Sequence, residues 1–170
     1  EGYLGCTPTF YSLNSWWSFV SNLPISKGTQ MYHRDYDDYR FCTIFVYLVD
    51  VDSDNGAHMF VKETHNGEFI PEKYFPPNEV YQDCDVEKDF GDKINVLIGK
   101  AGTGFVADTY AIHKGRPPKN RDRLILWARF GLDFNWTVQY QTPTPVSKNL
   151  LCDNIEFDDR LKYITRLLLQ

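Results

Sequence analysis

The residues of this chain that could do metal chemistry begin with His33 and Asp35, which lie two positions apart. Alternate residues of an extended strand project from the same face, so this imidazole and carboxylate can converge on one point. A second imidazole, His113, follows a strand-like run much further along the chain. Two imidazoles and one carboxylate on one side of a metal leave its other positions open, which is the ligand set of non-haem Fe(II) sites. The three residues therefore form a candidate iron site.

Arg123 comes after His113, at the head of the run Arg123–Phe130. Strand alternation places Arg123, Ile125, Trp127 and Arg129 on one face of this run, while the other face is apolar. The arginine-bearing face must then look into a wet pocket or to solvent. An arginine inside a β-sandwich needs an anionic partner, because an unpaired buried charge is expensive. A planar guanidinium matches a carboxylate, so we expect Arg123 to bind a dicarboxylate that also chelates the metal.

Short runs of β-branched and aromatic residues must position these side chains. We expect strands at residues 9–18, 30–35, 41–51, 57–62, 94–98, 104–108, 124–132 and 137–141. The polar stretch 64–93 is expected to be a long loop with one helical turn near 79–83. A C-terminal helix opening at Asp158 should pack an apolar stripe on the sheet (Leu161, Ile164, Leu167, Leu168). Many short strands and few helices indicate an all-β jelly roll of cupin type.

Composition narrows the classes of protein to which the chain could belong. Its 170 residues suit one domain, and its 16% aromatic content suits strands. A net charge of −5 argues against a nucleic-acid partner. No run approaches the ~18 apolar residues of a membrane span. The four cysteines are dispersed (Cys6, Cys42, Cys84, Cys152), so we expect no cysteine zinc site, and reduced thiols in the cytoplasm.

The order of these motifs resembles the phytanoyl-CoA dioxygenase-like branch of the Fe(II)/2-oxoglutarate oxygenases. The matching stretches are His33-Arg34-Asp35, the segment from Asn55 to His65, and the segment from Gly104 through His113 to Arg123. The middle segment is similar to the family pattern N-G-x-L-x-x-x-P-G-S-H, but it has Glu63-Thr64-His65 in the turn. The family commonly carries N-terminal helices that are absent here. We therefore expect residues 1–170 to be one oxygenase domain that lacks part of its N-terminal region.

The resemblance implies a double-stranded β-helix with a few peripheral helices, which binds Fe(II) through His33, Asp35 and His113. It makes Arg123 the partner of the C5 carboxylate of 2-oxoglutarate, with O2 as the other cosubstrate and ascorbate helpful in vitro. Thr43 and Asn14, on neighbouring strands, are further candidate partners of 2-oxoglutarate. Related halogenases replace the acid by Ala or Gly. Because this chain keeps Asp35, we expect hydroxylation of a small molecule, with release of succinate and CO2.

Other polar residues have both a functional and a plainer interpretation. Candidate substrate contacts are Tyr36, Trp127, Arg129 and Arg116. The last belongs to a basic cluster that could form a positive mouth for an anionic substrate or simply a solvated loop (Lys114, Arg116, Lys119, Arg121, Arg123). Asp37 and Asp38 are expected to be a solvated acidic cluster. His65 is expected to make structural hydrogen bonds, and His58 to have no metal role.

Two other functions fit the sequence. One is a non-catalytic jelly-roll module that binds carbohydrate on aromatic platforms, and chelators would not affect its sugar binding. The other is a cupin-type metalloenzyme that does not use 2-oxoglutarate. A titration of 2-oxoglutarate into the metal-loaded protein separates the latter from an oxygenase of the family named above.

Overall fold

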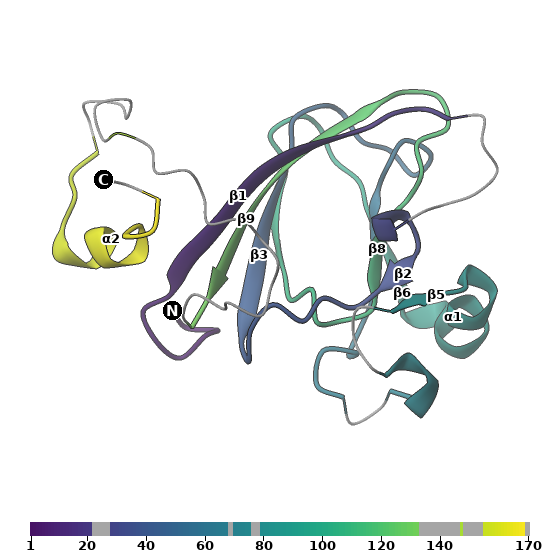
Figure 1. Cartoon of the computed structure of the whole chain (residues 1–170). Helices are drawn as coiled ribbons and strands as arrows, with labels where there is room; N and C mark the ends of the chain where they lie inside the picture. Colours follow the sequence, from purple (N-terminus) through teal and green to yellow (C-terminus); the bar gives the residue numbers. More distant parts are fainter. Residues whose placement is uncertain (22–27, 68–69, 76–78, 133–146, 148–154, 169–170) are drawn as a thin grey trace.

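The described part of the chain forms two antiparallel β-sheets (Figure 1). His33, His113 and Arg123 lie on their strands, while Asp35 follows two residues after β2 ends. The computed structural model describes residues 1–21, 28–67, 70–75, 79–132, 147 and 155–168. The first sheet has the order β1 (Thr9–Ser18), β9 (Arg123–Gly131), β3 (Phe41–Tyr47) and β7 (Gly104–Ala107). The second has the order β5 (Val80–Tyr81), β2 (Tyr32–His33), β8 (His113–Gly115), β4 (His58–Val61) and β6 (Ile94–Leu97).

Neighbouring strands come from distant parts of the sequence. In the first sheet β9 pairs with both β1 and β3, and in the second β8 pairs with both β2 and β4. This alternation between two facing sheets is the jelly-roll topology expected from the sequence. The all-β fold class is therefore confirmed. The pairing also means that late strands, β8 and β9, insert beside early ones and bring their side chains together.

One apolar cluster lies between the two sheets. Its buried members include Tyr47, Val51 and Ile125, and Phe45 and Trp127 pack against it. Tyr47 is fully buried, and its hydroxyl donates to the carbonyl of Leu97 on the opposite sheet. The cluster thus joins the two sheets and also forms part of the wall of an interior cavity, through Phe45, Ile125 and Trp127.

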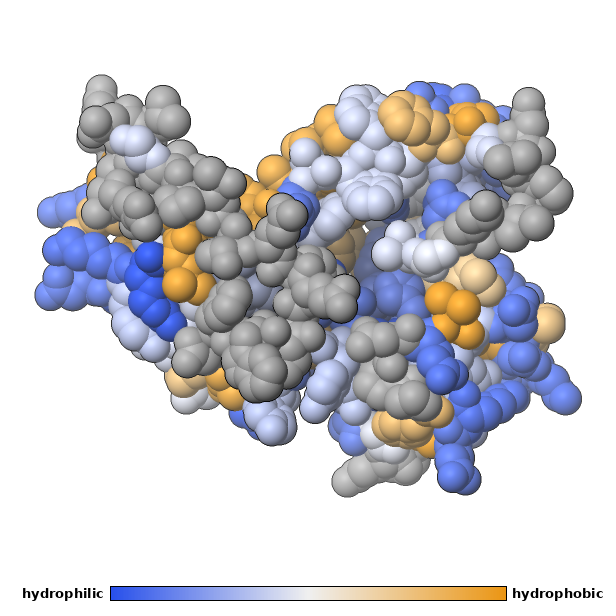
Figure 2. All heavy atoms as spheres, viewed as in Figure 1, coloured by the Kyte–Doolittle hydropathy of each residue, from blue (hydrophilic) through white to orange (hydrophobic). Residues whose placement is uncertain are grey.

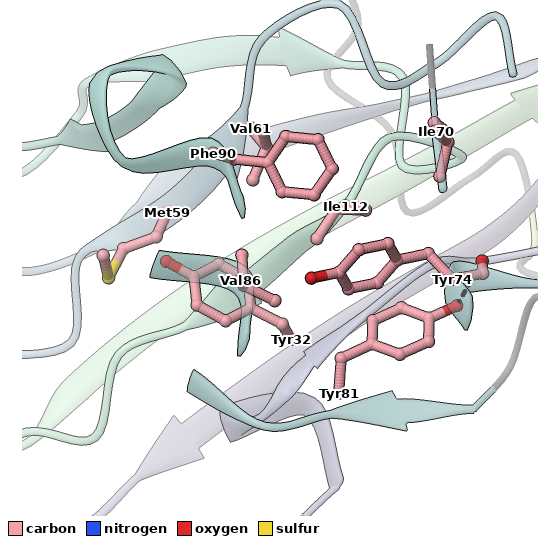
Figure 3. Close-up of a cluster of buried hydrophobic side chains, with 9 residues drawn as sticks. All are labelled: Tyr32, Met59, Val61, Ile70, Tyr74, Tyr81, Val86, Phe90 and Ile112. Carbon is pink, nitrogen blue, oxygen red and sulfur yellow. Dashed lines mark hydrogen bonds between the residues drawn. The ribbon is translucent and has the colours of Figure 1, made fainter. Parts of the chain in front are cut away.

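A second apolar cluster covers the outer face of the five-stranded sheet (Figure 3). Met59 and Val61 alternate on β4 and point to this face, while Val86 and Phe90 come from α1 (Asp83–Phe90). The cluster is completed by residues of the neighbouring strands and loops (Tyr32, Ile70, Tyr74, Tyr81, Ile112). Val86 and Phe90 are one helical turn apart, so a single face of α1 is buried.

The expectation of a long loop at 64–93 is wrong. The described part of this stretch contains η2 (Glu72–Tyr74), β5, α1 and η3 (Gly91–Lys93). The helix begins at Asp83, where the expected turn was to end, and acids in its first turn suit the helix dipole. Only two of its residues are buried, so its polar composition hid it from the sequence pattern.

At the C-terminus, α2 (Asp159–Ile164) is capped by Asp158, whose side chain accepts a hydrogen bond from the amide of Leu161. The guanidinium of Arg166 donates to Thr9 of β1, and Leu168 is buried. The strand expected at 137–141 lies outside the described residues. Hydrophilic residues dominate the surface over α1 in Figure 2. Within the described residues, Cys6, Cys42 and Cys84 are free, and no helix is long and apolar enough to cross a membrane.

Candidate metal centre

Strand pairing brings the two imidazoles of the sequence motif face to face. His33 on β2 is the direct partner of His113 on β8. Asp35 follows two residues after His33. Its backbone amide donates a 2.9 Å hydrogen bond to the carbonyl of Thr109, which lies shortly before β8 in the sequence. One ligand atom from each of these residues lies within 4.8 Å of the other two. The structure thus brings His33, Asp35 and His113 together as one cluster.

The two rings present the same nitrogen to this cluster. Nδ1 of His33 lies 2.8 Å from the carbonyl oxygen of Met31, and Nδ1 of His113 lies 2.9 Å from that of Ala111. A carbonyl only accepts hydrogen bonds, so both Nδ1 atoms carry the proton and both Nε2 atoms keep a lone pair. This tautomer is the one that binds a metal through Nε2.

The spacing of the ligand atoms suits an ion between them. Nε2 of His33 lies 3.6 Å from Oδ1 of Asp35, and Nε2 of His113 lies 3.7 Å from Oδ2. Both separations are too long for hydrogen bonds. Metal–nitrogen bonds of roughly 2.1 Å at right angles place adjacent ligand atoms about 3 Å apart, so closure of about half an ångström is enough.

Charge and burial set the protonation states that metal binding needs. Burial tends to raise the pKa of Asp35, but the neighbouring His113, His33 and Arg129 together hold it below its usual value. Burial, with the charge of His33, lowers the pKa of His113 to about 4. At neutral pH Asp35 is therefore ionised and His113 is neutral, which are the metal-binding forms of both.

Arg34 separates the two ligands in the sequence and points away from them. Its side chain is fully buried, with Nε donating to the carbonyl of Tyr110 (2.7 Å) and Nη1 to that of Tyr74 (3.3 Å). The guanidinium also lies over the rings of Phe75 and Tyr110. Arg34 thus anchors the loops on the outer side of the strand, while His33 and Asp35 face the interior.

A buried chain of polar groups reaches Asp35 from the other sheet. Nη2 of Arg129 lies 3.5 Å from Oδ2 of Asp35, and Nη1 lies 3.1 Å from Oδ2 of Asp37. The hydroxyl of Tyr11 donates to the same Asp37 oxygen at 3.3 Å. Burial raises the pKa of Asp37 to about 6, although Arg129 opposes this. The expectation that Asp37 and Asp38 are solvated is wrong, since both are buried.

A cavity of about 250 Å³ lies against the cluster, between the two sheets. Its lining includes all three residues of the cluster and the face of β9 that carries Arg123, Ile125, Trp127 and Arg129. The sequence expectation that this arginine-bearing face looks into a pocket therefore agrees with the observed lining. His58 and Phe45 complete the wall on the neighbouring strands.

Arg123 is one of two buried arginines in the described lining of this cavity, the other being Arg129. Its Nη1 donates to the carbonyl of Gly56 (2.7 Å) and its Nη2 to the hydroxyl of Ser18 (2.8 Å). Gly56 has φ +86°, and a Cβ there would lie 2.7 Å from Cδ of Arg123, so only glycine fits. Burial lowers the pKa of Arg123. No acid of the described chain forms an ion pair with it, so the site favours an anion from outside.

Several buried donors around the cavity have no hydrogen-bond partner within the described residues. Three belong to lining residues, namely Nε of Arg123, Nε1 of Trp127 and Nε2 of His58, whose ring nitrogen donates in one of its two tautomers. The fourth is the hydroxyl of Thr43, two residues before Phe45 on β3. Buried polar groups are normally paired, so an unpaired set of this kind suits an acceptor-rich ligand. Together with the metal cluster, these groups suit an anion with several oxygens.

The structure separates the remaining site candidates. Trp127 and Arg129 line the cavity, and Thr43 is fully buried opposite Arg129 in the first sheet. Asn14 is on the exposed part of β1, outside the cavity lining, and its side-chain amide donates to the hydroxyl of the buried Ser12.

Two expected substrate contacts also lie away from this cavity. Tyr36 is 45% exposed and packs against Tyr110, while Arg116 donates to the carbonyl of Ser53. Three of the five residues of the basic cluster form ion pairs, Lys114–Asp83, Lys119–Asp54 and Arg121–Asp52, which leaves less free charge for the alternative of a positive mouth.

The turn at Glu63-Thr64-His65 departs from the family pattern, but it is held by structural hydrogen bonds of its own. Thr64 is buried, and its hydroxyl donates to the carbonyl of Val61 and accepts from the amide of Ile112, next to His113. Glu63 stands in the left-handed region with φ 65°, which favours glycine. His65 is exposed. Thr64, rather than the expected His65, therefore makes the structural hydrogen bonds of this turn.

Comparison with known proteins gives one family and several similar folds. The model of the phytanoyl-CoA dioxygenase (PhyH) family matches residues 3–123. The sequence matches none of the curated proteins searched. Among solved structures, HygX from Streptomyces hygroscopicus with nickel and 2-oxoglutarate bound is 17% identical, with TM-score 0.50, over 75% of this chain and 57% of that one. EctD from S. alaskensis with bound Fe is 14% identical, with TM-score 0.50, over 75% of this chain and 46% of that one.

A third similar structure is ThoJ, described as a non-heme monooxygenase in its apo form. It is 13% identical, with TM-score 0.50, over 74% of this chain and 47% of that one. This chain therefore spans about half the length of these three proteins. At these identities, the likeness supports the jelly-roll fold.

Proposed function

Because this chain belongs to the phytanoyl-CoA dioxygenase family, we propose that it is an Fe(II)- and 2-oxoglutarate-dependent oxygenase that acts on a small molecule. The observation that carries the proposal is one cavity lined by both the His33–Asp35–His113 cluster and the buried Arg123. HygX, which has the same fold, was solved with 2-oxoglutarate bound, and EctD was solved with Fe.

The distance between the metal cluster and Arg123 suits a five-carbon dicarboxylate. A Cβ on Gly115 would lie 3.0 Å from Nη1 of Arg123, so the guanidinium sits beside this residue. Gly115 is two residues beyond His113 on β8, which corresponds to roughly 7 Å along a strand. A chelating group at the metal and a carboxylate at Arg123 would therefore be separated by about the length of 2-oxoglutarate.

In this proposal His33, Asp35 and His113 hold Fe(II) on one side. The bound metal supplies the activation of O2 that oxidises the substrate and converts 2-oxoglutarate to succinate and CO2. Arg123 binds the C5 carboxylate and fixes the direction of the cosubstrate. Phe45, Ile125 and Trp127 exclude water from the cavity wall.

We further propose hydroxylation as the outcome, rather than halogenation. Asp35 faces both Nε2 atoms and supplies the third protein ligand. A halide would need the position that this carboxylate takes. Arg129 shares the cavity with the cluster, and with Trp127 it is proposed to face the substrate.

The test begins with purified protein, Fe(II), ascorbate, O2 and 2-oxoglutarate, with succinate measured over a panel of small molecules. A parallel titration adds 2-oxoglutarate to the Mn(II)-loaded protein. Succinate formation that needs Fe(II) and intact His33 would support the proposal. Metal binding without any 2-oxoglutarate binding would favour a cupin-type metalloenzyme. Sugar binding that persists in a chelator, with no metal bound, would favour a carbohydrate-binding module.

A further inference from the structure

His58 is a buried imidazole that the roles described so far leave unused. Its side chain begins β4 and is 4% exposed. Nε2 is buried without a hydrogen-bond partner, and no hydrogen bond from the described residues reaches Nδ1. Leaving a ring of this kind unpaired in the interior costs free energy, because the nitrogens lose their bonds to water. The structure therefore favours a ligand group that forms a hydrogen bond with the imidazole of His58.

The position of His58 in the sheet places it near the guanidinium of Arg123. It pairs with Gly115 across β4 and β8, while the next inward residue, Phe60, pairs with His113. Gly115 lacks a side chain, and the Arg123 guanidinium lies beside it, with Nη1 3.0 Å from the position that a Cβ would take. His58 and Arg123 thus flank Gly115 at the same level of the sandwich, two residues beyond the metal ligand.

Aromatic rings hold the imidazole at this level. The His58 ring centroid lies 5.1 Å from that of Phe45, 5.2 Å from that of Phe105 and 5.5 Å from that of His113. Its backbone amide donates to the hydroxyl of Tyr47 at 2.9 Å. These contacts fix the ring without using its nitrogens, so its hydrogen-bonding capacity is preserved for a ligand.

Arg123 alone leaves a bound carboxylate incompletely paired. Two of its nitrogens already donate to Gly56 and Ser18, and Nε has no partner. A carboxylate offers about four acceptor positions. An imidazole N–H on the same cavity wall would fill one of them. In the family pattern N-G-x-L the corresponding position is leucine, which cannot donate a hydrogen bond.

We propose that His58 is a second binding residue for the distal carboxylate of 2-oxoglutarate, acting together with Arg123. This inference rests on the proposed function, since it assumes that 2-oxoglutarate is the ligand of the cavity. It assigns to this chain a two-residue carboxylate site made by β4 and β9. The expected result is a stronger preference for a ligand with a distal carboxylate than Arg123 alone would give.

The experiment measures equilibrium binding to the Mn(II)-loaded full chain, with and without substitution of His58. His58→Leu installs the apolar residue of the family pattern and should weaken 2-oxoglutarate binding roughly 10- to 100-fold, the value of one hydrogen bond to a charged group. Oxalate chelates the metal but has no distal carboxylate, so its affinity should not change. His58→Asn retains an N–H donor and should recover part of the loss.

The outcomes separate this inference from the function on which it rests. The exposed His65→Leu variant is the matched control and should bind both ligands like the original protein. Equal affinity of the original protein and His58→Leu for 2-oxoglutarate overturns the role of His58 alone. Parallel loss of 2-oxoglutarate and oxalate binding also overturns it, because His58 would then act on the metal site. Failure of the unsubstituted Mn(II) protein to bind 2-oxoglutarate overturns the proposed function and this inference with it.

Discussion

His33 and His113 are direct cross-strand partners on β2 and β8, and their ring centroids lie 4.2 Å apart. Each ring is fixed by its own Nδ1 contact to a backbone carbonyl, at Met31 and Ala111 respectively. The strands thus orient the Nε2 lone pairs of both rings before any ion binds. A site built in this way on rigid strands is preorganised, so metal binding should add directly to the stability of the fold.

The first prediction concerns metal-dependent stability. Mn(II) at a hundredfold excess over its dissociation constant should raise the free energy of unfolding by about 2.7 kcal/mol. His33→Ala and Asp35→Ala should lose this gain, because each removes one of three ligands. Chemical unfolding with and without Mn(II) measures this gain in the free energy of unfolding for each protein. His65→Ala, which changes an exposed histidine, should keep the full gain. Equal stabilisation of His33→Ala and the unsubstituted protein would place the metal elsewhere.

The second prediction concerns Arg123. Arg123→Leu should weaken 2-oxoglutarate binding to the Mn(II) protein by about 100-fold, because a charged hydrogen-bonding partner is lost. The affinity for Mn(II) itself should stay the same, since Arg123 does not belong to the ligand cluster. Isothermal titration gives both constants. Arg116→Leu removes a positive charge outside the cavity and serves as the control. A comparable loss in that control would mean that general charge, not Arg123, attracts the ligand.

The spacing of residues in the sequence predicts much of the metal cluster and of the cavity wall beside it. The alternation of His33 with Asp35 and of Arg123 with Trp127 is local, and the structure places each pair on one inward face. The expected boundaries of β1, β4, β6, β7 and β9 lie within one residue of the observed ones, because β-branched and aromatic runs define them. The short strands β5 and β8 were not expected, since neither contains such a run. Family resemblance supplied the link between these distant segments, which spacing alone does not provide.

The sequence does not predict which side chains from distant parts of the chain contact one another. The basic residues after His113 look like a positive mouth until the fold brings Asp52, Asp54 and Asp83 against them. Asp37 looks solvated until Arg129 and Tyr11 enclose it. In both cases the partner lies far away in the chain, so the side chain's environment depends on strand register. The surroundings of His58 depend on register in the same way, because its neighbour Gly115 is on another strand.

The third prediction concerns the positioning of Asp35 by Arg129. Arg129→Gln should weaken Mn(II) binding by roughly 10- to 100-fold, the usual effect of losing a residue that orients a metal ligand. Asp37→Asn should act in the same direction but less strongly, because it removes the carboxylate that holds Arg129. Mn(II) affinity followed by electron paramagnetic resonance is the measurement. Arg129→Lys keeps the charge and should recover part of the affinity. Unchanged affinity in a folded Arg129→Gln protein would contradict the positioning role.

The last prediction concerns Glu63, which has φ 65° where the family pattern places glycine. An L-residue in this region pays about 1–2 kcal/mol, and glycine does not. Glycine also loses more chain entropy on folding, which offsets about 0.4–1 kcal/mol of this gain. Glu63 forms an exposed ion pair with Lys93, so Glu63→Ala is the matched reference, because both substitutions remove that pair. We expect Glu63→Gly to be about 0.5–1 kcal/mol more stable than Glu63→Ala in urea unfolding. If Glu63→Ala is equally or more stable, the turn stores no strain, and the contacts of Thr64 alone account for its shape.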